Sequence, residues 1–370
     1  MSASPMTTNL EPTPPDSEPS PKAGQPSGVT RLAGRVVSVA SVLDLVVVLV
    51  LLILLCVVSE DWWLSLAMTY LPRVLFVLPP LFLFVAALIV RRQWIWVNLF
   101  SLLLVVVPIM GLRIPLPSIL GSSSTGELLT VVSCNIQGGR GNLLKTLSEL
   151  KDIDPDVVVL QEANDGISML LPFFEDWSRV HTGEYFVASR YPVKLRDSCR
   201  SDAFGRITAI LCEVDSPDGP FLICNVHLST ARFGLSRLRL DSILSGVGLE
   251  QLDVRQDLRE MESVDTRAFA SQDGFETPLL VMGDFNTPTS SSLFQLHWHD
   301  LSSAFDVAGF GYGYTSPCSD PAHWPSNTPW LRIDHILSSR HWTTESCWIG
   351  SLDGSDHRLI AATVRMEPVE

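Results

Sequence analysis

Three long apolar stretches fall within the first 112 residues of this 370-residue chain, and they constrain its fold more than any other feature. The first covers residues 36–58 and contains 14 consecutive apolar residues from Leu45 onward. The other two cover about 71–90 and 94–112. A helix of about 20 apolar residues is long enough to cross the hydrocarbon core of a bilayer. We therefore expect residues 31–113 to form a membrane anchor of three transmembrane helices.

The regions before and after these stretches differ from them in composition. Residues 1–30 are rich in Pro, Ser and Thr and lack the large apolar residues that a core needs, which predicts a disordered tail. The first 120 residues hold seven basic and six acidic residues, whereas the remainder hold 19 and 34, a net charge of −15. Such an acidic domain disfavours a protein that grips duplex nucleic acid through extensive basic patches.

The basic residues also predict the orientation of the anchor. Five fall on one side of the predicted membrane and two on the other: Lys22, Arg31, Arg35, Arg91 and Arg92 against Arg73 and Arg113. Loops rich in Lys and Arg tend to stay in the cytoplasm. The sequence therefore predicts an integral protein of the inner or plasma membrane, with a cytoplasmic tail, three spans and residues 120 onward outside the cytoplasm.

A linker rich in Gly and Ser, about 114–127, precedes a region of short apolar runs and amphipathic segments. The apolar runs predict strands at 128–136, 156–163, 185–191, 206–214, 221–229, 278–286, 330–338 and 357–366. The amphipathic segments predict helices at about 141–151, 232–246, 250–270 and 291–305. Strands and helices intermixed in this way predict an α/β or α+β domain over 128–366.

Polar side chains recur where the predicted strands end or begin. They are Asn135, Gln161 with Glu162, Asn225 with His227, Asp284 with Asn286, Asp334 with His335, and Asp356 with His357. One Asn or Asp at a strand end is usually a turn former, but six such groups indicate a shared site at one edge of the sheets. Carboxylate and amide oxygens suit a hard cation such as Mg²⁺ or Mn²⁺, and histidines beside them suit proton transfer. The cysteines lack the paired spacing of a zinc site.

At these residues the chain resembles the endonuclease/exonuclease/phosphatase superfamily, the deoxyribonuclease I-like proteins. The spaced motifs occur in order: N-x-Q at Asn135, Q-E at Gln161, N-x-H at Asn225, G-D-F-N at Gly283, I-D-H-I at Ile333 and S-D-H at Ser355. The resemblance covers about residues 128–366. It implies a four-layer sandwich in which two mixed β-sheets pack face to face between helices, with the site at one edge of the sheets.

The resemblance also implies roles for the motif residues. Glu162 would be the principal ligand of Mg²⁺ or Mn²⁺, with Asn135 beside it and Asp356 supporting the same or a second ion. Two arginines that follow site strands, Arg140 and Arg232, are candidates for binding the substrate phosphate; solvated surface arginines are the alternative for both.

The remaining motif residues would carry out the proton transfers. His357 would be the general base, oriented by Asp334, because a carboxylate bonded to one imidazole nitrogen fixes the tautomer. Asp284 and Asn286 would position the attacking water and the phosphate. His227 would bind phosphate and act as general acid.

These inferences predict a membrane-anchored, divalent-metal-dependent phosphoesterase whose catalytic domain faces away from the cytoplasm. Its substrate would be a phosphate ester in a nucleic acid, a phospholipid headgroup, or an inositol or sugar phosphate. The sequence indicates the membrane as a partner and identifies no protein partner. The alternative is a non-catalytic receptor or scaffold built on the same fold.

Overall fold

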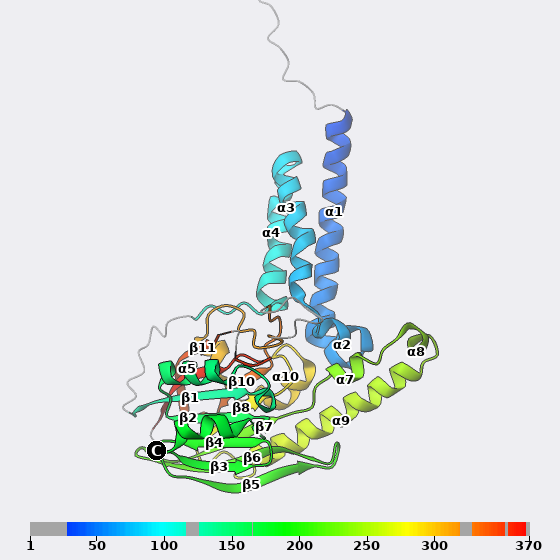
Figure 1. The fold of residues 1–370 in the computed structure, drawn as a ribbon. Coiled ribbons are helices and arrows are strands. Elements are labelled where there is room, and N and C mark those ends of the chain that lie inside the picture. Colours follow the sequence, from blue (N-terminus) through cyan, green and yellow to red (C-terminus); the bar gives the residue numbers. More distant parts are fainter. Residues whose placement is uncertain (1–27, 116–125, 165, 319–327, 352–353, 368–370) are drawn as a thin grey trace, which may run out of the picture.

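The structure is a computed structural model that describes residues 28–115, 126–164, 166–318, 328–351 and 354–367. Most of the predicted tail and most of the predicted linker lie outside these described residues. Figure 1 shows two parts, a bundle of long helices and a layered domain of strands and helices at one end of the bundle.

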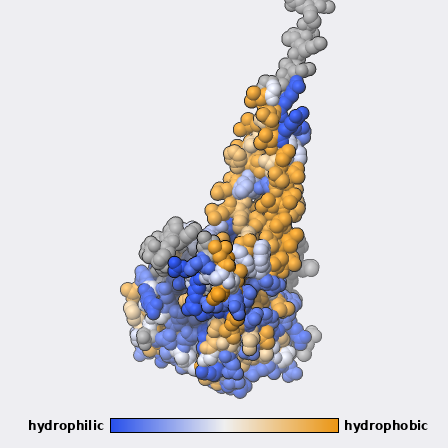
Figure 2. Space-filling view, turned by 90° about the vertical axis from the view of Figure 1, so that its right-hand side faces the viewer, coloured by the Kyte–Doolittle hydropathy of each residue, from blue (hydrophilic) through white to orange (hydrophobic). Residues whose placement is uncertain are grey.

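The N-terminal bundle consists of three helical segments that are long and apolar enough to cross a membrane: Gly28–Asp61, Arg73–Val90 and Arg92–Ile109. Apolar side chains cover most of the face of the bundle that Figure 2 shows. The helical elements of this part are α1 (Gly28–Ile53), η1 (Leu54–Val58), η2 (Ser59–Asp61), α2 (Trp63–Thr69), η3 (Arg73–Val77), α3 (Leu78–Val90), η4 (Arg92–Trp94), α4 (Ile95–Leu104) and η5 (Val105–Ile109).

The second part contains two six-stranded sheets, each with parallel and antiparallel pairs. The first sheet has the order β11 (Trp342–Ile349), β12 (Ile360–Met366), β1 (Leu128–Asn135), β2 (Val157–Gln161), β4 (Tyr185–Ser189) and β3 (Ser178–Thr182). The second has the order β5 (Val193–Ser201), β6 (Arg206–Ser216), β7 (Gly219–His227), β8 (Leu279–Asp284), β10 (Asp334–Ser338) and β9 (Ser302–Ser303).

Helices flank the two sheets. They are η6 (Gln137–Gly139), α5 (Leu143–Ile153), α6 (Ile167–Leu170), η7 (Leu171–Phe174), α7 (Arg232–Leu235), α8 (Leu240–Leu244), α9 (Val247–Ala270), α10 (Ser292–Trp298) and α11 (Ala304–Ala308). Helices α5 and α6 cover the first sheet, whereas α9 and α10 cover the second.

Three buried apolar clusters fill the spaces between these layers. In β1, Val131 packs between the sheets while its neighbour Val132 packs against α5. In β7, Ile223 likewise faces the first sheet while Cys224 faces the outer helices. Successive residues of a strand point to opposite faces, so a strand buried on both faces is a nearly continuous apolar run. The prediction of a four-layer sandwich with two mixed sheets is confirmed.

Two predicted helices are interrupted. The segment 232–246 was expected to be one helix, but α7 ends at Leu235 and α8 begins at Leu240. The segment 291–305 contains α10, the short strand β9 and the beginning of α11. Four strands were not predicted at all: β3, β5, β9 and β11.

Candidate active site

The topology brings the predicted polar residues to one edge of both sheets. Strands β1 and β2 run parallel, with Asn135 opposite Gln161. Strands β7 and β8 also run parallel, with His227 opposite Asp284. Strand β10 is antiparallel to β8 and starts at Asp334, directly opposite Asp284. The strand ends therefore meet at the same edge.

His357 and Asp334 form a buried pair at this edge. The Nδ1 atom of His357 lies 2.8 and 3.1 Å from the two carboxylate oxygens of Asp334. Burial disfavours the imidazolium, but the charges of Asp334 and Asp284 outweigh that effect and hold the pKa of His357 well above its ordinary value. Because Nδ1 is bonded to Asp334, Nε2 is the atom left to face Asp284, 3.7 Å away.

His227 is held in the same manner by a residue that the sequence did not indicate. Its Nδ1 atom lies 3.1 Å from Glu184 Oε1, and its Nε2 atom lies 3.7 Å from Asp284 Oδ2. Burial opposes the charged form, but the bond to Glu184 and the charge of Asp284 raise the pKa of His227 overall. Glu184 also pairs with Arg206 at 3.3 Å. It lies in the turn between β3 and β4, outside every motif, so no sequence signal marked it.

Asp284 lies between the two histidines. Its Oδ2 atom accepts hydrogen bonds from the side-chain amides of Asn135 at 3.2 Å and Asn286 at 3.1 Å, and Oδ1 accepts from the backbone N–H of Asn286 at 2.8 Å. Burial raises the pKa of Asp284 to about 6, against the lowering effect of the charge on His357. The second amide hydrogen of Asn286 is donated to the carbonyl of Leu228 at 2.8 Å. Asn286 therefore fixes the position of Asp284.

The predicted metal ligands line the same cavity. Asn135 donates to Glu162 Oε1 at 3.0 Å, and its own amide oxygen accepts from the backbone N–H of Gln137 at 2.9 Å. The carboxylate of Glu162 is 37% exposed and lies 3.9 Å from His227 Nε2. Asp356 also lines the cavity and accepts a hydrogen bond from Ser355 at 3.2 Å. Carboxylates from different strands thus converge on the cavity.

One further group of side chains has the spacing of a metal site. Among the described residues, ligand atoms of Asp284, Asp334 and His357 lie within 4.8 Å of one another. The Nδ1 atom of His357 and the carboxylate of Asp334 are already bonded to each other in this group. The side chain of Glu162, by contrast, is accessible, and the amide nitrogen of Asn135 is bonded both to it and to Asp284, so oxygen ligands for a hard cation lie close together here.

Two other motif residues connect the sheets behind the site. Gln161 of the first sheet donates to Asn225 Oδ1 of the second at 2.7 Å. Asn225 in turn donates to the carbonyls of Leu160 and Phe186 at 3.0 and 3.2 Å. His335 lies on the outer face of β10, where its Nε2 is 2.9 Å from the carbonyl of Thr287. These contacts hold the strand ends in place.

The predicted arginines differ from the motif residues in their surroundings. Arg140 and Arg232 are exposed and line the cavity. Within the described part of the chain, neither guanidinium has a hydrogen-bond or ion-pair partner. Arg206, which the sequence did not single out, lies at the cavity wall and donates to the carbonyl of His227 at 2.7 Å.

Comparison with known proteins gives one family and several similar folds. No curated protein matches the chain. An endonuclease/exonuclease/phosphatase from Beutenbergia cavernae is 16% identical, with a TM-score of 0.45, and the match covers 65% of this chain and 72% of that chain. The 3'-5' exonuclease NExo from Neisseria meningitidis is 17% identical, with a TM-score of 0.48 and coverage of 63% and 98%. Truncated TDP2 from Caenorhabditis elegans is 16% identical, with a TM-score of 0.45 and coverage of 64% and 98%.

The sequence model of the Endonuclease/Exonuclease/phosphatase family matches residues 132–357, more than half of the chain. The matched range begins in β1 and ends at His357, so it includes every strand end that contributes to the site. The resemblance drawn from the spaced motifs is confirmed, and the chain belongs to the endonuclease/exonuclease/phosphatase family.

Proposed function

We propose that this protein is a divalent-metal-dependent phosphoesterase in which a water molecule, deprotonated by His357, attacks phosphorus. Members of its family are hydrolases that act on phosphoester bonds. The observation that carries the proposal is the pair of imidazoles facing one carboxylate: Nε2 of His357 and Nε2 of His227 each lie 3.7 Å from Asp284 Oδ2. A phosphoryl group bound beside Asp284 would be within reach of both.

The two histidines suit opposite proton transfers. Asp334 holds Nδ1 of His357, so Nε2 can take a proton from water, and the carboxylate stabilises the resulting imidazolium. Glu184 holds Nδ1 of His227, so Nε2 of His227 faces the site beside Asp284 and can donate a proton to a phosphoryl or leaving-group oxygen. Asp284, fixed by Asn286, orients the attacking water.

We propose Mg²⁺ or Mn²⁺ as the cation, with Glu162 as its principal ligand and Asn135 and Asp356 as further ligands. Their carboxylate and amide oxygens are the donors that hard cations prefer. Ligation by Asn135 requires its amide to turn, because its oxygen accepts from Gln137 and its nitrogen faces two carboxylates. The bound cation would neutralise charge on the phosphoryl oxygens and lower the pKa of a coordinated water.

We further propose that the three apolar helices anchor the protein in a membrane, with the catalytic domain outside the cytoplasm. The start of α1 and the turn at η4 lie at the end of the bundle away from the domain (Figure 1). That end carries Arg31, Arg35, Arg91 and Arg92. The positive-inside tendency places such an end in the cytoplasm.

The test is chelator-sensitive hydrolysis of methyl p-nitrophenyl phosphate by the full chain in detergent. We expect activity with Mg²⁺ or Mn²⁺ and none after chelation. His357→Ala and Glu162→Ala should each lower kcat by about 10³-fold or more, since proton transfer and metal binding each contribute on this scale.

The exposed residues His299 and Glu276 provide matched controls, and His299→Ala and Glu276→Ala should leave kcat unchanged. If no phosphoester is hydrolysed in a chelator-sensitive manner, the non-catalytic receptor or scaffold is favoured instead. Equal loss of activity in the control variants would also contradict the assignment of His357 and Glu162.

A further inference from the structure

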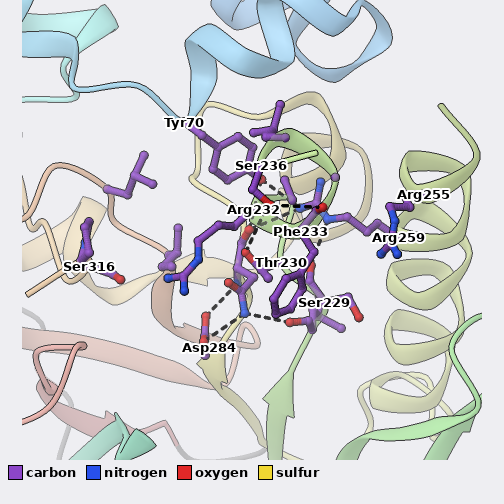
Figure 3. A pocket seen from close by; sticks show the side chains of 18 of the residues that line it. Tyr70, Ser229, Thr230, Arg232, Phe233, Ser236, Arg255, Arg259, Asp284 and Ser316 are labelled. Atoms are coloured by element: carbon purple, nitrogen blue, oxygen red, sulfur yellow. Dashed lines mark hydrogen bonds between the residues drawn. The ribbon is translucent and has the colours of Figure 1, made fainter. Parts of the chain in front are cut away.

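The candidate active site is one end of a much larger cavity. The cavity has a volume of about 1430 Å³ and extends from the strand ends to the segment that connects the first two apolar helices. We call residues 60–71 the inter-span segment. It contributes Trp63, Ala67, Tyr70 and Leu71 to the cavity wall. Figure 3 shows Asp284 at one end of this cavity and Tyr70, with the inter-span segment behind it, at the other.

A buried ion pair fixes the inter-span segment to the catalytic domain. Arg259 of α9 lies 3.1 Å from Glu60, and the two side chains are only 3% and 2% exposed. The hydroxyl of Tyr70 donates to the carbonyl of Asn286, 3.1 Å away and two residues after Asp284. The remaining donors of Arg259 reach the carbonyl of Ser229, the side chains of Gln256, Tyr70 and Thr287, and the carbonyl of Asn286. The wall that this segment forms is therefore a fixed part of the site.

The wall of the cavity near the anchor is apolar. Leu66 of α2 is buried against Ala231 and Leu252 of the domain. Around this contact, Trp63, Leu235 and Leu238 remain partly exposed and line the cavity together with Ala67 and Phe233. A phosphate or a sugar gains nothing from such a surface, whereas an alkyl chain gains about 0.8 kcal/mol for each buried CH₂ group.

The apolar wall lies at the level where the apolar helices end. In Figure 1, α7 lies directly below α2, near the end of α1, and α8 lies further out at about the same height. Phe233 of α7 is 60% exposed, and Leu244 and Val247 further along are 78% and 52% exposed. Large exposed apolar side chains beside the end of a membrane span are typical of contact with the lipid interface. A lipid can therefore reach the cavity from the adjacent leaflet.

Three arginines also contribute to the wall of the cavity. Arg140, Arg232 and Arg255 all line the cavity. The described residues provide no ion-pair partner for any of their guanidinium groups. Cationic side chains in the wall of a cavity that joins the acidic site to an apolar surface suit an anionic amphiphile, which has a phosphate followed by a chain.

From this arrangement we infer that the substrate is a membrane lipid phosphoester, whose phosphate binds at Asp284 and whose alkyl chain lies between α2 and α7. The inference rests on the proposed phosphoesterase function and adds the substrate class. In the reaction, the water oxygen forms a bond to phosphorus while the ester P–O bond breaks. His357 takes the water proton and His227 protonates the departing oxygen, so only water is consumed.

The test is a series of p-nitrophenyl alkyl phosphates with methyl, hexyl and dodecyl chains, hydrolysed by the full chain at fixed detergent concentration. We expect kcat/KM to rise by about tenfold or more from the methyl to the dodecyl ester, because the chain buries CH₂ groups against the apolar wall. Phe233→Asp and Ala67→Asp should each remove most of this rise, so that the ratio of kcat/KM for the dodecyl ester to that for the methyl ester falls toward one. Phe233→Leu should retain the rise.

Leu144→Asp is the matched control, since Leu144 is 68% exposed, close to the 60% of Phe233, but lies on α5 and does not line the cavity. It should retain both the activity and the ratio. Hydrolysis of the methyl ester without any gain from the longer chains would overturn the lipid inference alone. Absence of chelator-sensitive hydrolysis of all three esters would overturn the proposed function as well. Faster hydrolysis of plasmid DNA than of the dodecyl ester would favour a nucleic acid and also contradict the inference.

Discussion

Asp284 is the residue at which the contributions of both sheets meet. Asn135 reaches it from the first sheet, while His227 and Asn286 reach it from β7 and the loop after β8. The sequence predicted this convergence because each residue ends an apolar run, and polar groups at parallel strand ends meet at one edge. The sequence did not predict Glu184, because this turn residue lies outside every motif and meets its partner, His227, only in the folded chain.

Removal of the Glu184 charge should therefore impair catalysis without removing any predicted residue. Glu184→Gln leaves Nδ1 of His227 without its carboxylate, and we expect kcat for methyl p-nitrophenyl phosphate to fall on the order of 10²-fold. Glu213, which pairs with Lys194 and Arg196 on β5, provides the control. A kcat for Glu184→Gln as high as that of Glu213→Gln would show that catalysis does not need the pairing of His227 with Glu184.

A second residue-scale prediction concerns stability and pH. Burial, together with the charge of Arg332, lowers the pKa of His335 to about 4, from a model-peptide value of 6.5. The folded chain holds this imidazole neutral, whereas the unfolded chain protonates it below pH 6.5. The contribution of His335 to stability is therefore present above pH 6.5 and is lost as the pH falls through 4, a change of about 3 kcal/mol in the free energy of unfolding.

The measurement is the thermal unfolding midpoint of the full chain in detergent between pH 7.5 and 4. In the structure, the carbonyl of Thr287 lies 2.9 Å from Nε2 of His335. The side-chain amide of His335→Gln can still donate to this carbonyl but cannot titrate. The variant should lose stability less steeply on acidification than the original chain. An identical slope in both proteins would assign the acid sensitivity to other groups.

At the scale of elements, the strands that the sequence missed are all at the edges of sheets. The first sheet ends in β11 and β3, and the second ends in β5 and β9. Most residues of β5 are exposed, and Lys194 and Arg196 on it pair with Glu213 of β6. Edge strands carry charge because exposed apolar edges aggregate, and so they lack the apolar run by which the central strands were recognised.

The helix predicted over residues 232–246 is interrupted between α7 and α8. The periodicity of residues 232–246 predicts a single helix, yet the chain breaks after Leu235. Leu235 and Leu238 both pack toward the cluster formed by Leu66, Ala231 and Leu252. The helical conformation ends at Arg239, whose backbone is extended and whose N–H is bonded to Ser242 Oγ, and α8 begins at the next residue. Arg239 is neither Gly nor Pro, so no sequence signal marked this boundary.

The ion pair between Glu60 and Arg259 should dominate the stability of this junction. Arg259→Met leaves Glu60 buried without its cation, and we expect a loss of about 3–5 kcal/mol in the free energy of unfolding. Thermal unfolding of the full chain in detergent measures it. Arg255→Met, one turn earlier on α9 and without an ion-pair partner among the described residues, should change stability little. The double variant Glu60→Gln, Arg259→Met should recover part of the loss, and failure to do so would assign the effect to packing.

On the scale of the whole molecule, the sequence predicted an apolar anchor and an acidic domain, but not the cavity between them. Its walls come from segments as distant as Trp63, Phe233 and His357. Composition separates the two parts, because each has its own distribution of apolar and charged residues. Contacts between parts depend on a few residues, such as Glu60 and Tyr70, that no periodicity marks.

The proposed orientation predicts which surfaces are accessible from outside the cell. A membrane-impermeant maleimide should label Lys194→Cys in intact cells, since this side chain is 63% exposed on β5. Gln93→Cys, at the opposite end of the helices, should be labelled only after permeabilisation. Six of the seven native cysteines are buried and Cys56 lies within the first apolar helix, so background labelling should be low. The reverse labelling pattern would invert the topology.

The contact between Glu60 and Arg259 also has a consequence for the order of synthesis. The two residues are 199 positions apart, so the three apolar helices leave the ribosome long before α9 exists. During that interval the carboxylate of Glu60 must stay hydrated, and the docking face of α2 must stay open until the domain closes over it. A chimaera that carries this domain on a foreign tether would therefore lack one wall of its own cavity.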